Sequence, residues 1–560
     1  MDKWTIARTL DEIAKYIELS DPNPFRVRAF EKAARAIEKL DQDIEQLVRD
    51  DQLLTVPGIG KAIGPIVSEL VTTGGSRYLE ELREQYPPGI FELLRIPTLG
   101  LKKIGILHAT LGISNLEELE AAAHDGRIAK LKGFGAKTQE KILENIATAK
   151  SRTSQFLLPV GIETGESIRE QLAAIDEISD AEVTGSVRRR LEVVRNVNIA
   201  IAAKDPERAI AAIRKRGVID RIEEVDELTL RGVARDEIEV LLHLSKPDDF
   251  GATVLRTTGS KEFVEAFGKL PKAKTEHDVF ERAAVPFVDP ELREDASALA
   301  KKKRVKLIEP TDLRGTFHIH TTFSDGRNSV LEMLSAARDR GWEYAGLSDH
   351  SKNAFYARGL TEEDLKRQHA EIRTQEKVVE PMRVFRGTEA DILNDGAIDY
   401  GHKTLPMFDF VVASVHSRFG MEKDEMTARL LRALDDPFVT FLGHLTGRLL
   451  LSRQGYTFDF DKILDRAAER GVIIEINGSP RRLELDWRQI RRAVDRGVVL
   501  SIHPDAHSTR ELTYVISGTW VARKGGLSAK HLFNTRPVDE VAEYLAERRK
   551  KAIHKTKGAA

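Results

Sequence analysis

The segment that decides the fold reads Phe317-His318-Ile319-His320, and similar segments recur as far as His507. Each places a histidine or a carboxylate at the end of a short apolar run, and helix-like stretches separate many of them. Residues 383–386, 408–414, 439–442 and 498–502 are typical of buried strands. Seven such strand ends with intervening helices predict a (β/α) barrel, with functional residues at the C-terminal rim of its parallel strands.

These segments supply nine candidate metal ligands, which are His318, His320, Asp325, His350, Glu389, His416, His444, Asp505 and His507. Nine ligands are too many for one ion, so we expect two or three divalent ions. Mixed imidazole and carboxylate ligands suit Zn, Mn or Fe, Mg stays open, and the chain has no cysteine for a zinc finger. Clustered ions activate water and stabilise both oxygens of a phosphodiester displacement. The pattern therefore predicts a hydrolytic metal centre.

Three further histidines fall outside this pattern and are expected to be ordinary core or surface residues: His369, His402 and His503. His503 is close enough to Asp505 to support a ligand. Arg358, Arg448 and Asn477 follow strand ends, where they either orient a phosphate or make ordinary rim hydrogen bonds.

The segment from Asp312 to the C-terminus resembles the PHP (polymerase and histidinol phosphatase) domain, a distorted seven-stranded barrel with a trinuclear metal site. The resemblance extends to Thr446-Gly-Arg448 after His444, to Glu475-Ile-Asn477, and to Trp520-Val-Ala-Arg523. These motifs are similar to those of the barrel fused to bacterial and archaeal family X DNA polymerases. The resemblance implies that all nine ligand positions are filled. Three residues beside the ligands are taken as catalytic, namely Asp349, Arg448 and Asn477.

Composition limits the partners of the chain. Its 560 residues are enough for several domains, and 41% of them are hydrophobic. A net charge of −2 excludes a globally basic nucleic-acid binder, so any DNA contact has to be local. The absence of cysteine fits a reducing cytoplasm. No signal-peptide core and no apolar run of about 18 residues is found, so we expect a soluble cytoplasmic protein without a membrane partner.

Residues 1–150 are expected to be helical, with three recurring glycine turns. The turns are Val56-Pro-Gly58-Ile-Gly60, Ile96-Pro-Thr98-Leu-Gly100 and Leu131-Lys-Gly133-Phe-Gly135. Such a turn exposes backbone N–H groups at a helix N-terminus, where they hold a phosphate oxygen without reading a base. One copy is equally consistent with a plain connection between helices, whereas three copies with nearby lysines predict non-specific DNA binding. The DNA-binding candidates are Gly58, Gly60, Lys61, Gly100, Lys102, Gly133, Gly135 and Lys137.

Two departures qualify this region. Thr98 replaces the first glycine of the second turn, so that turn is expected to bind phosphate poorly. The family resembled here often carries a Schiff-base lysine shortly after the first hairpin, and the corresponding position is Ile66. No amine-based lyase chemistry is therefore expected there.

Residues 151–300 change to helices followed by short strands, as in a nucleotidyltransferase palm. In family X polymerases a turn like Gly185-Ser186 and the following arginines, here beginning at Arg188, hold the phosphates of the incoming nucleotide. The resemblance therefore implies a nucleotide pocket at this turn. Arg190, Arg195 and Arg256 replace glycine or aromatic residues that are usual in the family, and the thumb, residues 259–293, is short.

The three metal-binding aspartates of such a palm are all altered. Asn196 and Asn198 stand in the Asp-x-Asp positions, and Glu239 stands in the third. An amide oxygen is neutral, so it neither neutralises Mg²⁺ nor favours deprotonation of a primer hydroxyl. The resemblance therefore implies a polymerase fold whose polymerase chemistry is lost. The alternative is a weak gap-filling polymerase that uses Glu239 and nearby carboxylates.

The sequence thus predicts a multidomain α and α/β chain with three parts. These are a helix-hairpin-helix region (1–150), a degenerate palm and short thumb of α+β type (151–300), and a distorted (β/α)7 PHP barrel (310–560). The implied function is DNA repair, through metal-dependent hydrolysis of gapped, nicked or abasic DNA as a 3′–5′ exonuclease or end-processing enzyme. Whether the palm binds nucleotide stays open. The alternatives are a small-molecule phosphatase, against which the hairpins argue, and a non-catalytic DNA-end scaffold with structural metals.

Overall fold

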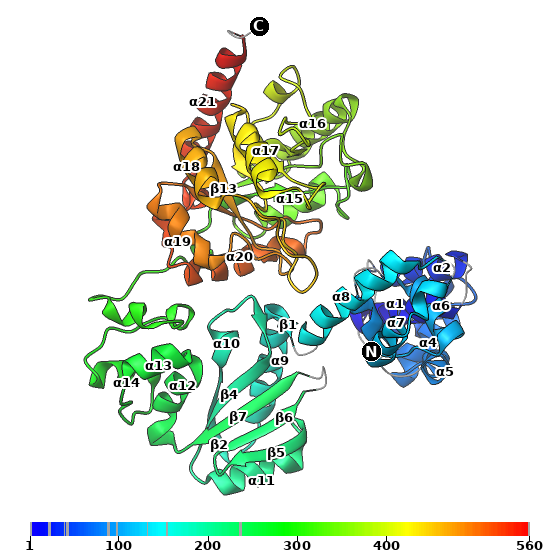
Figure 1. Ribbon diagram of the computed structural model, residues 1–560, viewed down its shortest axis with the longest axis vertical. Coiled ribbons are helices and arrows are strands. Elements are labelled where there is room, and N and C mark those ends of the chain that lie inside the picture. The colour runs from blue at the N-terminus through cyan, green and yellow to red at the C-terminus, as the bar shows by residue number, and fades with distance from the viewer. Residues whose placement is uncertain are drawn as a thin grey trace. The chain divides into compact units, whose positions relative to one another are not determined.

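The computed structural model describes residues 3–20, 24–38, 40, 44–86, 90–96, 99–131, 133–152, 155–234 and 238–557. The chain forms two compact units, Met1–Thr153 and Ser154–Ala560 (Figure 1). None of the helices in these described ranges is long and apolar enough to cross a membrane. The predicted fold class is confirmed, with a helical N-terminal region, a mixed α/β middle and a parallel seven-stranded barrel.

The first unit is helical. Its helices are α1 (Lys3–Ser20), α2 (Pro24–Glu38), α3 (Ile44–Arg49), α4 (Gly64–Thr73), α5 (Arg77–Gln85), α6 (Leu101–Leu111), α7 (Leu116–His124) and α8 (Ala136–Arg152). Three 3₁₀ turns, η1 (Leu53–Thr55), η2 (Ile90–Arg95) and η3 (Ile128–Lys130), precede the glycine turns that lead into α4, α6 and α8. Each glycine turn buries one apolar side chain in the shared core, namely Ile59, Leu99 or Phe134. This repeated anchor fixes the three turns in the same way, because the apolar residue packs inward while the glycine that follows it, Gly60, Gly100 or Gly135, stays exposed.

The second unit begins with a five-stranded sheet in the order β2-β4-β7-β6-β5. Its strands are β2 (Ile178–Thr184), β4 (Asn196–Ala203), β5 (Asp220–Asp226), β6 (Thr229–Val233) and β7 (Glu239–Ser245). Strands β4 and β7 run parallel and the other pairs run antiparallel. Two short strands, β1 (Phe156–Leu157) and β3 (Val193–Val194), form a separate antiparallel pair. The accompanying helices are α9 (Leu158–Ala173), α10 (Gly185–Arg188), α11 (Pro206–Arg216), α12 (Phe250–Thr258), α13 (Lys261–Phe267) and α14 (Glu276–Arg282).

The barrel strands pair in chain order and are all parallel. They are β8 (Gly315–Ile319), β9 (Tyr344–Leu347), β10 (Arg383–Asp391), β11 (Phe410–Ser414), β12 (Phe441–Leu442), β13 (Ile473–Asn477) and β14 (Leu500–His503). A parallel bridge between Ile319 and Ala506 nearly closes the ring. Helices surround the strands (Figure 1). Those that connect successive strands are α15 (Val330–Arg338), α16 (Glu362–Glu376), α17 (Lys423–Asp435), α18 (Phe460–Arg470) and α19 (Trp487–Asp495), and those that follow β14 are α20 (Tyr514–Lys524) and α21 (Val538–Lys557).

Aromatic rings fill the barrel interior below the strand ends. The ring of Phe317 lies 4.9 Å from the rings of Phe410 and of Phe441, centroid to centroid. Glycines make room for these rings, because a Cβ at Gly387 would lie 2.3 Å from the Phe410 ring and one at Gly346 would lie 2.4 Å from the Phe317 ring. The interior is therefore a solid core. Polar residues at the C-terminal strand ends are consequently held against a rigid floor.

Candidate metal centre

All nine predicted ligands gather at the C-terminal ends of the barrel strands. Every one of them belongs to a group of histidine, aspartate and glutamate residues whose ligand atoms lie within 4.8 Å of one another. Two of these groups share no residue, namely His318 with His320 and Asp505, and His350 with Glu389 and His416. A third group, which adds Asp325 and His507, shares a histidine with each of them. The geometry is therefore suited to more than one ion.

Glu389, on β10, lies close to four of the predicted histidine ligands. Its Oε1 is 2.9 Å from His444 Nε2, 3.1 Å from His416 Nε2 and 3.3 Å from His318 Nε2. Its Oε2 is 3.0 Å from His350 Nδ1. One fully buried carboxylate thus faces imidazoles from four different strand ends, which is the arrangement of a bridging ligand.

Asp325 and Asp505 lie close to two further predicted ligands, His320 and His507. Asp505 Oδ1 lies 3.4 Å from His320 Nε2, and Asp325 Oδ1 lies 3.4 Å from His507 Nε2 and 3.8 Å from His320 Nδ1. The rings of His320 and His507 are stacked with centroids 4.1 Å apart. Asp325 reaches the site from the loop after β8, which explains how a residue outside a strand joins the group.

The electrostatics favour cations. Burial opposes ionisation of Glu389, but the surrounding imidazoles of His350 and His416 hold its pKa well below the usual range. Burial likewise opposes ionisation of Asp325, yet the hydrogen bond from His507 and the charge of nearby imidazoles lower its pKa to about 2. Burial and the neighbouring imidazoles of His507 and His350 lower the pKa of His320 to about 4, so this ring is neutral and free to ligate.

Orphaned nitrogens test whether these residues fit metal ions. Within the described ranges, His318 Nε2, both ring nitrogens of His320 and Nδ1 of His350 are buried and make no hydrogen bond of normal geometry, although oxygens of Glu389 and Asp505 lie close to three of them. Buried polar atoms in native proteins almost always have a partner, and a metal ion is one that lone-pair nitrogens accept. Three ligands, His318, His444 and Asp505, also have positive φ angles of 63°, 22° and 53°. Such strain in residues other than glycine gathers at functional sites.

Carboxylates behind the ligands orient them. Glu475 Oε2 lies 2.5 Å from His318 Nδ1 and 2.9 Å from His503 Nδ1, and its Oε1 accepts the backbone N–H of His444 at 2.9 Å. Asp391 lies 2.7 Å from His416 Nδ1. Such carboxylate–histidine pairs fix the tautomer and raise the basicity of a ligand.

The sequence contained Glu475 only as a flanking motif, although its spacing was a usable signal. Glu475 and Asn477 are two residues apart in a buried strand and therefore lie on one face of β13. Asn477 donates to Glu475 at 2.8 Å and to Asp505 at 3.0 Å. His503 likewise joins the network through Glu475, whereas His369 and His402 belong to none of the ligand groups.

The other two residues predicted to be catalytic have internal partners. The Asp349 carboxylate accepts hydrogen bonds from Thr321, Ser324 and Gln368, and so holds the turn that leads to Asp325. The Arg448 guanidinium donates to Asp486 at 2.7 Å. It also donates to the carbonyl oxygens of Arg482 and Leu483.

Arg482 was not singled out from the sequence, yet it reaches the site. Its Nε lies 3.4 Å from Asp505 Oδ2, and its buried Nη1 has no hydrogen-bond partner within the described ranges. Beside it, a cavity of about 480 Å³ opens onto Asp325, Asp505 and His507. The same cavity is lined by Arg327 and Arg481 and by one further carboxylate, Glu511, so two arginines lie across from the acidic ligands.

The middle sheet brings together Asn196, Asn198 and Glu239, the three positions that the resemblance assigns to palm metal ligands. Asn196 pairs with Glu239 across β4 and β7, and its Nδ2 donates to Glu239 Oε1 at 3.3 Å. Asn198 donates to Asn196 Oδ1 at 2.9 Å and contacts His243 Nε2 through its own Oδ1 at 2.9 Å. Burial lowers the pKa of His243 to about 4, so this imidazole stays neutral. The amides are thus satisfied by one another, and Gly185 packs directly on Asn198.

The arginines of the predicted nucleotide pocket also have internal partners. Arg188, after Ser186 in α10, binds both oxygens of Glu276 at 3.0 and 3.1 Å. Arg189 donates to Glu294 at 2.9 Å. The Arg190 guanidinium lies 4.7 Å from the ring centre of Trp520, on barrel helix α20. Arg188 and Arg189, at the turn predicted to hold nucleotide phosphates, thus already form ion pairs with carboxylates of the chain.

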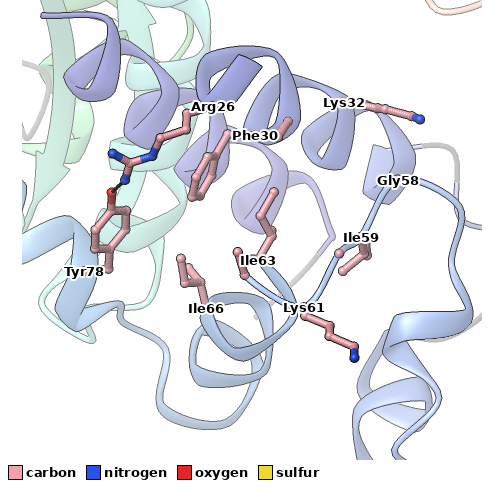
Figure 2. Close-up of a pocket in the computed structure, with 12 residues that line it drawn as sticks. Arg26, Phe30, Lys32, Gly58, Ile59, Lys61, Ile63, Ile66 and Tyr78 are labelled. Carbon is pink, nitrogen blue, oxygen red and sulfur yellow. Dashed lines mark hydrogen bonds between the residues drawn. The ribbon is translucent and has the colours of Figure 1, made fainter. Parts of the chain in front are cut away.

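The first hairpin borders a cavity of about 710 Å³. Figure 2 shows Phe30 and Tyr78 on one wall and Ile66 beside them, with the Lys61 amine at the edge. Phe30 and Tyr78 are stacked with centroids 6.1 Å apart. Ile66 lines this cavity, at the position where the resemblance places a lyase lysine.

The DNA-binding candidates are the glycines of the three turns and the lysines that follow those glycines. Gly58, Gly133 and Gly135 have positive φ angles, and Gly100 caps α6. Lys61, Lys102 and Lys137 are exposed. Thr98 falls outside the described residues.

Three domain-family models match this chain. A helix-hairpin-helix domain matches residues 1–76, a SAM-like helix-hairpin-helix tandem matches residues 90–148, and the PHP domain matches residues 316–479. The chain is 32% identical over 570 residues to the DNA polymerase/3'-5' exonuclease PolX of Bacillus subtilis, covering 97% of this chain and 99% of that protein. It is 24% identical over 245 residues to a probable phosphatase of a Thermoanaerobacter species, covering 42% of this chain and 95% of the relative. A probable phosphatase of Photobacterium profundum is 28% identical over 247 residues, with the same coverage of 42% and 95%.

Proposed function

Because this chain belongs to the PolX family of DNA polymerase/3'-5' exonucleases, we propose that its barrel cleaves phosphodiester bonds of DNA. The substrates are gapped, nicked or abasic strands, and the activity is 3′–5′ trimming or related end processing. The observation that carries the proposal is the convergence of nine histidines and carboxylates, Glu389 among them, at the strand ends.

The ligand set would hold two or three divalent ions, of Mn, Zn or Fe, with Mg also open. Bound ions supply an activated water and neutralise the charge of the phosphate. The chain's own residues hold the site in shape. Asn477 steadies Asp505, Asp349 braces the turn that leads to Asp325, and Arg448 fixes the loop that carries Arg482. We assign these three predicted catalytic residues positioning roles, and we place Arg482 where it would contact a phosphate oxygen.

The charge around the site supports a polyanionic substrate over a small phosphoester. Four exposed arginines follow predicted ligands within a few residues in the chain, namely Arg327, Arg358, Arg418 and Arg510, and a fifth, Arg481, lines the cavity that opens onto Asp325, Asp505 and His507. In the part of the chain that the structure describes, none of the five has a carboxylate within ion-pair distance. Most other barrel arginines do, as Arg386 does with Asp409 at 3.1 Å. Unpaired cations around an acidic centre suit the successive phosphates of a DNA strand.

We propose further that the palm no longer synthesises DNA. In support, Asn196 and Asn198 supply neutral amides where two Mg²⁺ ions need carboxylates, and both amides already bond to neighbours. Arg188 is held by Glu276, so a nucleotide would have to displace an internal ion pair. The competing candidate is weak gap filling through Glu239.

The three hairpins would supply DNA affinity by backbone contacts to phosphates, as the matches to helix-hairpin-helix domains support. Ile66 offers no amine to the cavity beside the first hairpin, so no lyase step is assigned to it. A small-molecule phosphatase is the second candidate, favoured only by the relatives described as probable phosphatases.

The test is incubation of the purified protein with gapped DNA labelled at one end, with Mn²⁺, with and without nucleotides. The proposal expects a labelled strand that shortens in both conditions and is stable in chelator. A strand that lengthens with nucleotides would instead support the polymerase alternative.

A further inference from the structure

The loop from Ser351 to Leu360, between β9 and α16, carries two neighbouring aromatic side chains that point into solvent. Phe355 is 84% exposed and Tyr356 is 68% exposed. Full burial of such a side chain stabilises a fold by about 1.5–3 kcal/mol, and neither of these two side chains makes that contribution. Single exposed apolar residues are ordinary, but an adjacent aromatic pair beside a metal centre is a candidate binding surface.

The loop is held in place by its backbone. Ala354 N–H donates to Ser351 O at 3.0 Å, Gly359 N–H donates to Ala354 O at 3.0 Å, and Leu360 N–H donates to His350 O at 2.8 Å. Ala354 is fully buried, and a Cβ at Gly359 would lie 1.8 Å from Ser351 O, so only glycine fits there. The two rings are therefore presented by a packed turn that does not fold them inward.

The same loop is tied to the metal site. Asn353 Nδ2 donates to Asp391 at 3.0 Å, and Asp391 also orients the ligand His416. The Tyr356 ring lies 6.0 Å from the His350 ring and 6.1 Å from the His416 ring, centroid to centroid. These two histidines flank Glu389 in one ligand group. The Tyr356 ring thus stands directly beside residues that would hold the ions, and Phe355 precedes it in the same exposed turn.

We propose that Phe355 and Tyr356 form a stacking platform for an unpaired base at the end of a nucleic-acid strand whose terminal phosphodiester lies at the metal centre. The proposal rests on the proposed function and names its substrate class, a single-stranded or frayed end. Aromatic side chains stack on base faces whatever the sequence. Within a duplex both faces of a base are already covered, so the platform selects unpaired nucleotides. A small phosphoester without a base would gain nothing from it.

The experiment pairs two substrates with matched variants of the full chain. The substrates are single-stranded oligonucleotides with an ordinary 3′-terminal nucleotide or with a base-free one, assayed with Mn²⁺. The variants are Phe355→Ala, Tyr356→Ala and Tyr356→Phe, with Val378→Ala as the control. Val378 is 54% exposed and lies in the chain beyond α16.

Stacking predicts a specific pattern. Each alanine variant loses about 5- to 150-fold in kcat/KM on the ordinary strand, mainly through KM, and little on the base-free strand. Tyr356→Phe and Val378→Ala stay close to wild type on both. An equal loss on both strands, or no loss on either, would overturn the platform.

A second readout does not depend on cleavage. A strand with 2-aminopurine at its 3′ end is titrated with metal-free protein, and stacking of this fluorescent base on an aromatic ring quenches its emission. We expect quenching by wild type and Tyr356→Phe, and its loss in the alanine variants. Unchanged quenching in the alanine variants would contradict the proposal. If wild type quenches but never shortens a strand, the proposed function fails while the platform stands.

Discussion

Replacing Glu475 by glutamine probes how the carboxylates behind the ligands hold the metal centre. Each carboxylate oxygen accepts from two donors: Oε2 faces Nδ1 of His318 and of His503, and Oε1 faces the N–H of His444 and Nδ2 of Asn477. Glutamine keeps the shape but turns one oxygen into an NH₂ group. That group would face two donors, so two buried hydrogen bonds are lost in either orientation.

The magnitude follows from this count. Hydrogen bonds to a charged group contribute about 1.5–3 kcal/mol each. Loss of two of them therefore destabilises this arrangement of side chains by about 3–6 kcal/mol. Partial rearrangement relieves some of this. Loss of a carboxylate that orients a ligand lowers metal affinity by about 10- to 100-fold, and we expect the upper end because His318 and His444 are both affected.

The assay is metal content after dialysis against stepped free Mn²⁺, followed by nuclease activity at each step. Thermal unfolding in chelator separates metal loss from loss of fold. Glu469→Gln is the control, since its pair with Arg466 at 3.2 Å is a surface salt bridge that contributes about 0–1 kcal/mol. Metal content and activity equal to wild type in Glu475→Gln would refute the role given to this carboxylate.

Further outcomes follow from the same structure. Binding of gapped DNA, measured by filter binding or anisotropy, should weaken steeply with salt and depend little on sequence, because hairpin N–H groups contact phosphates. A variant lacking residues 1–150 that binds as tightly as the full chain would contradict this. Restoring Asn196→Asp, Asn198→Asp and Glu239→Asp together should give partial rescue of primer extension at most, measured in an Asp505→Ala background where degradation cannot mask synthesis. Robust extension by the unaltered palm in that background would remove the case for a lost polymerase.

The candidate ligands could be brought together from the sequence because most of them lie at the end of an apolar run that becomes a barrel strand, Asp325 being an exception in the loop after β8. His318, Glu389 and His444 are examples, and parallel strands bring such residues to one rim. Strand limits were less predictable. The run 439–442 was expected as a strand, whereas β12 covers only Phe441–Leu442; Thr440 still bonds to both neighbouring strands, and the carbonyl of Val439 accepts a hydrogen bond from Arg548.

The orienting network could not be predicted, because it depends on contacts between distant residues. Arg448 follows a ligand in sequence, but Asp486, 38 residues away, fixes its side chain away from solvent. Phe355 and Tyr356 were not singled out in the sequence, and their exposure became visible only in the structure. Asn196 and Asn198 are the opposite case, since their neutral amides are evident from residue type alone.

The most direct test of the central claim is the fate of an end-labelled strand of gapped DNA with Mn²⁺, compared between wild type and Asp505→Ala. Asp505 lies 3.4 Å from His320 Nε2 and 3.5 Å from His318 Nε2, so its removal opens the ligand group that these residues form. We predict that wild type shortens the strand and that the variant, folded to the same extent by circular dichroism, leaves it intact. Shortening at the wild-type rate by Asp505→Ala would contradict a nuclease centre in the barrel.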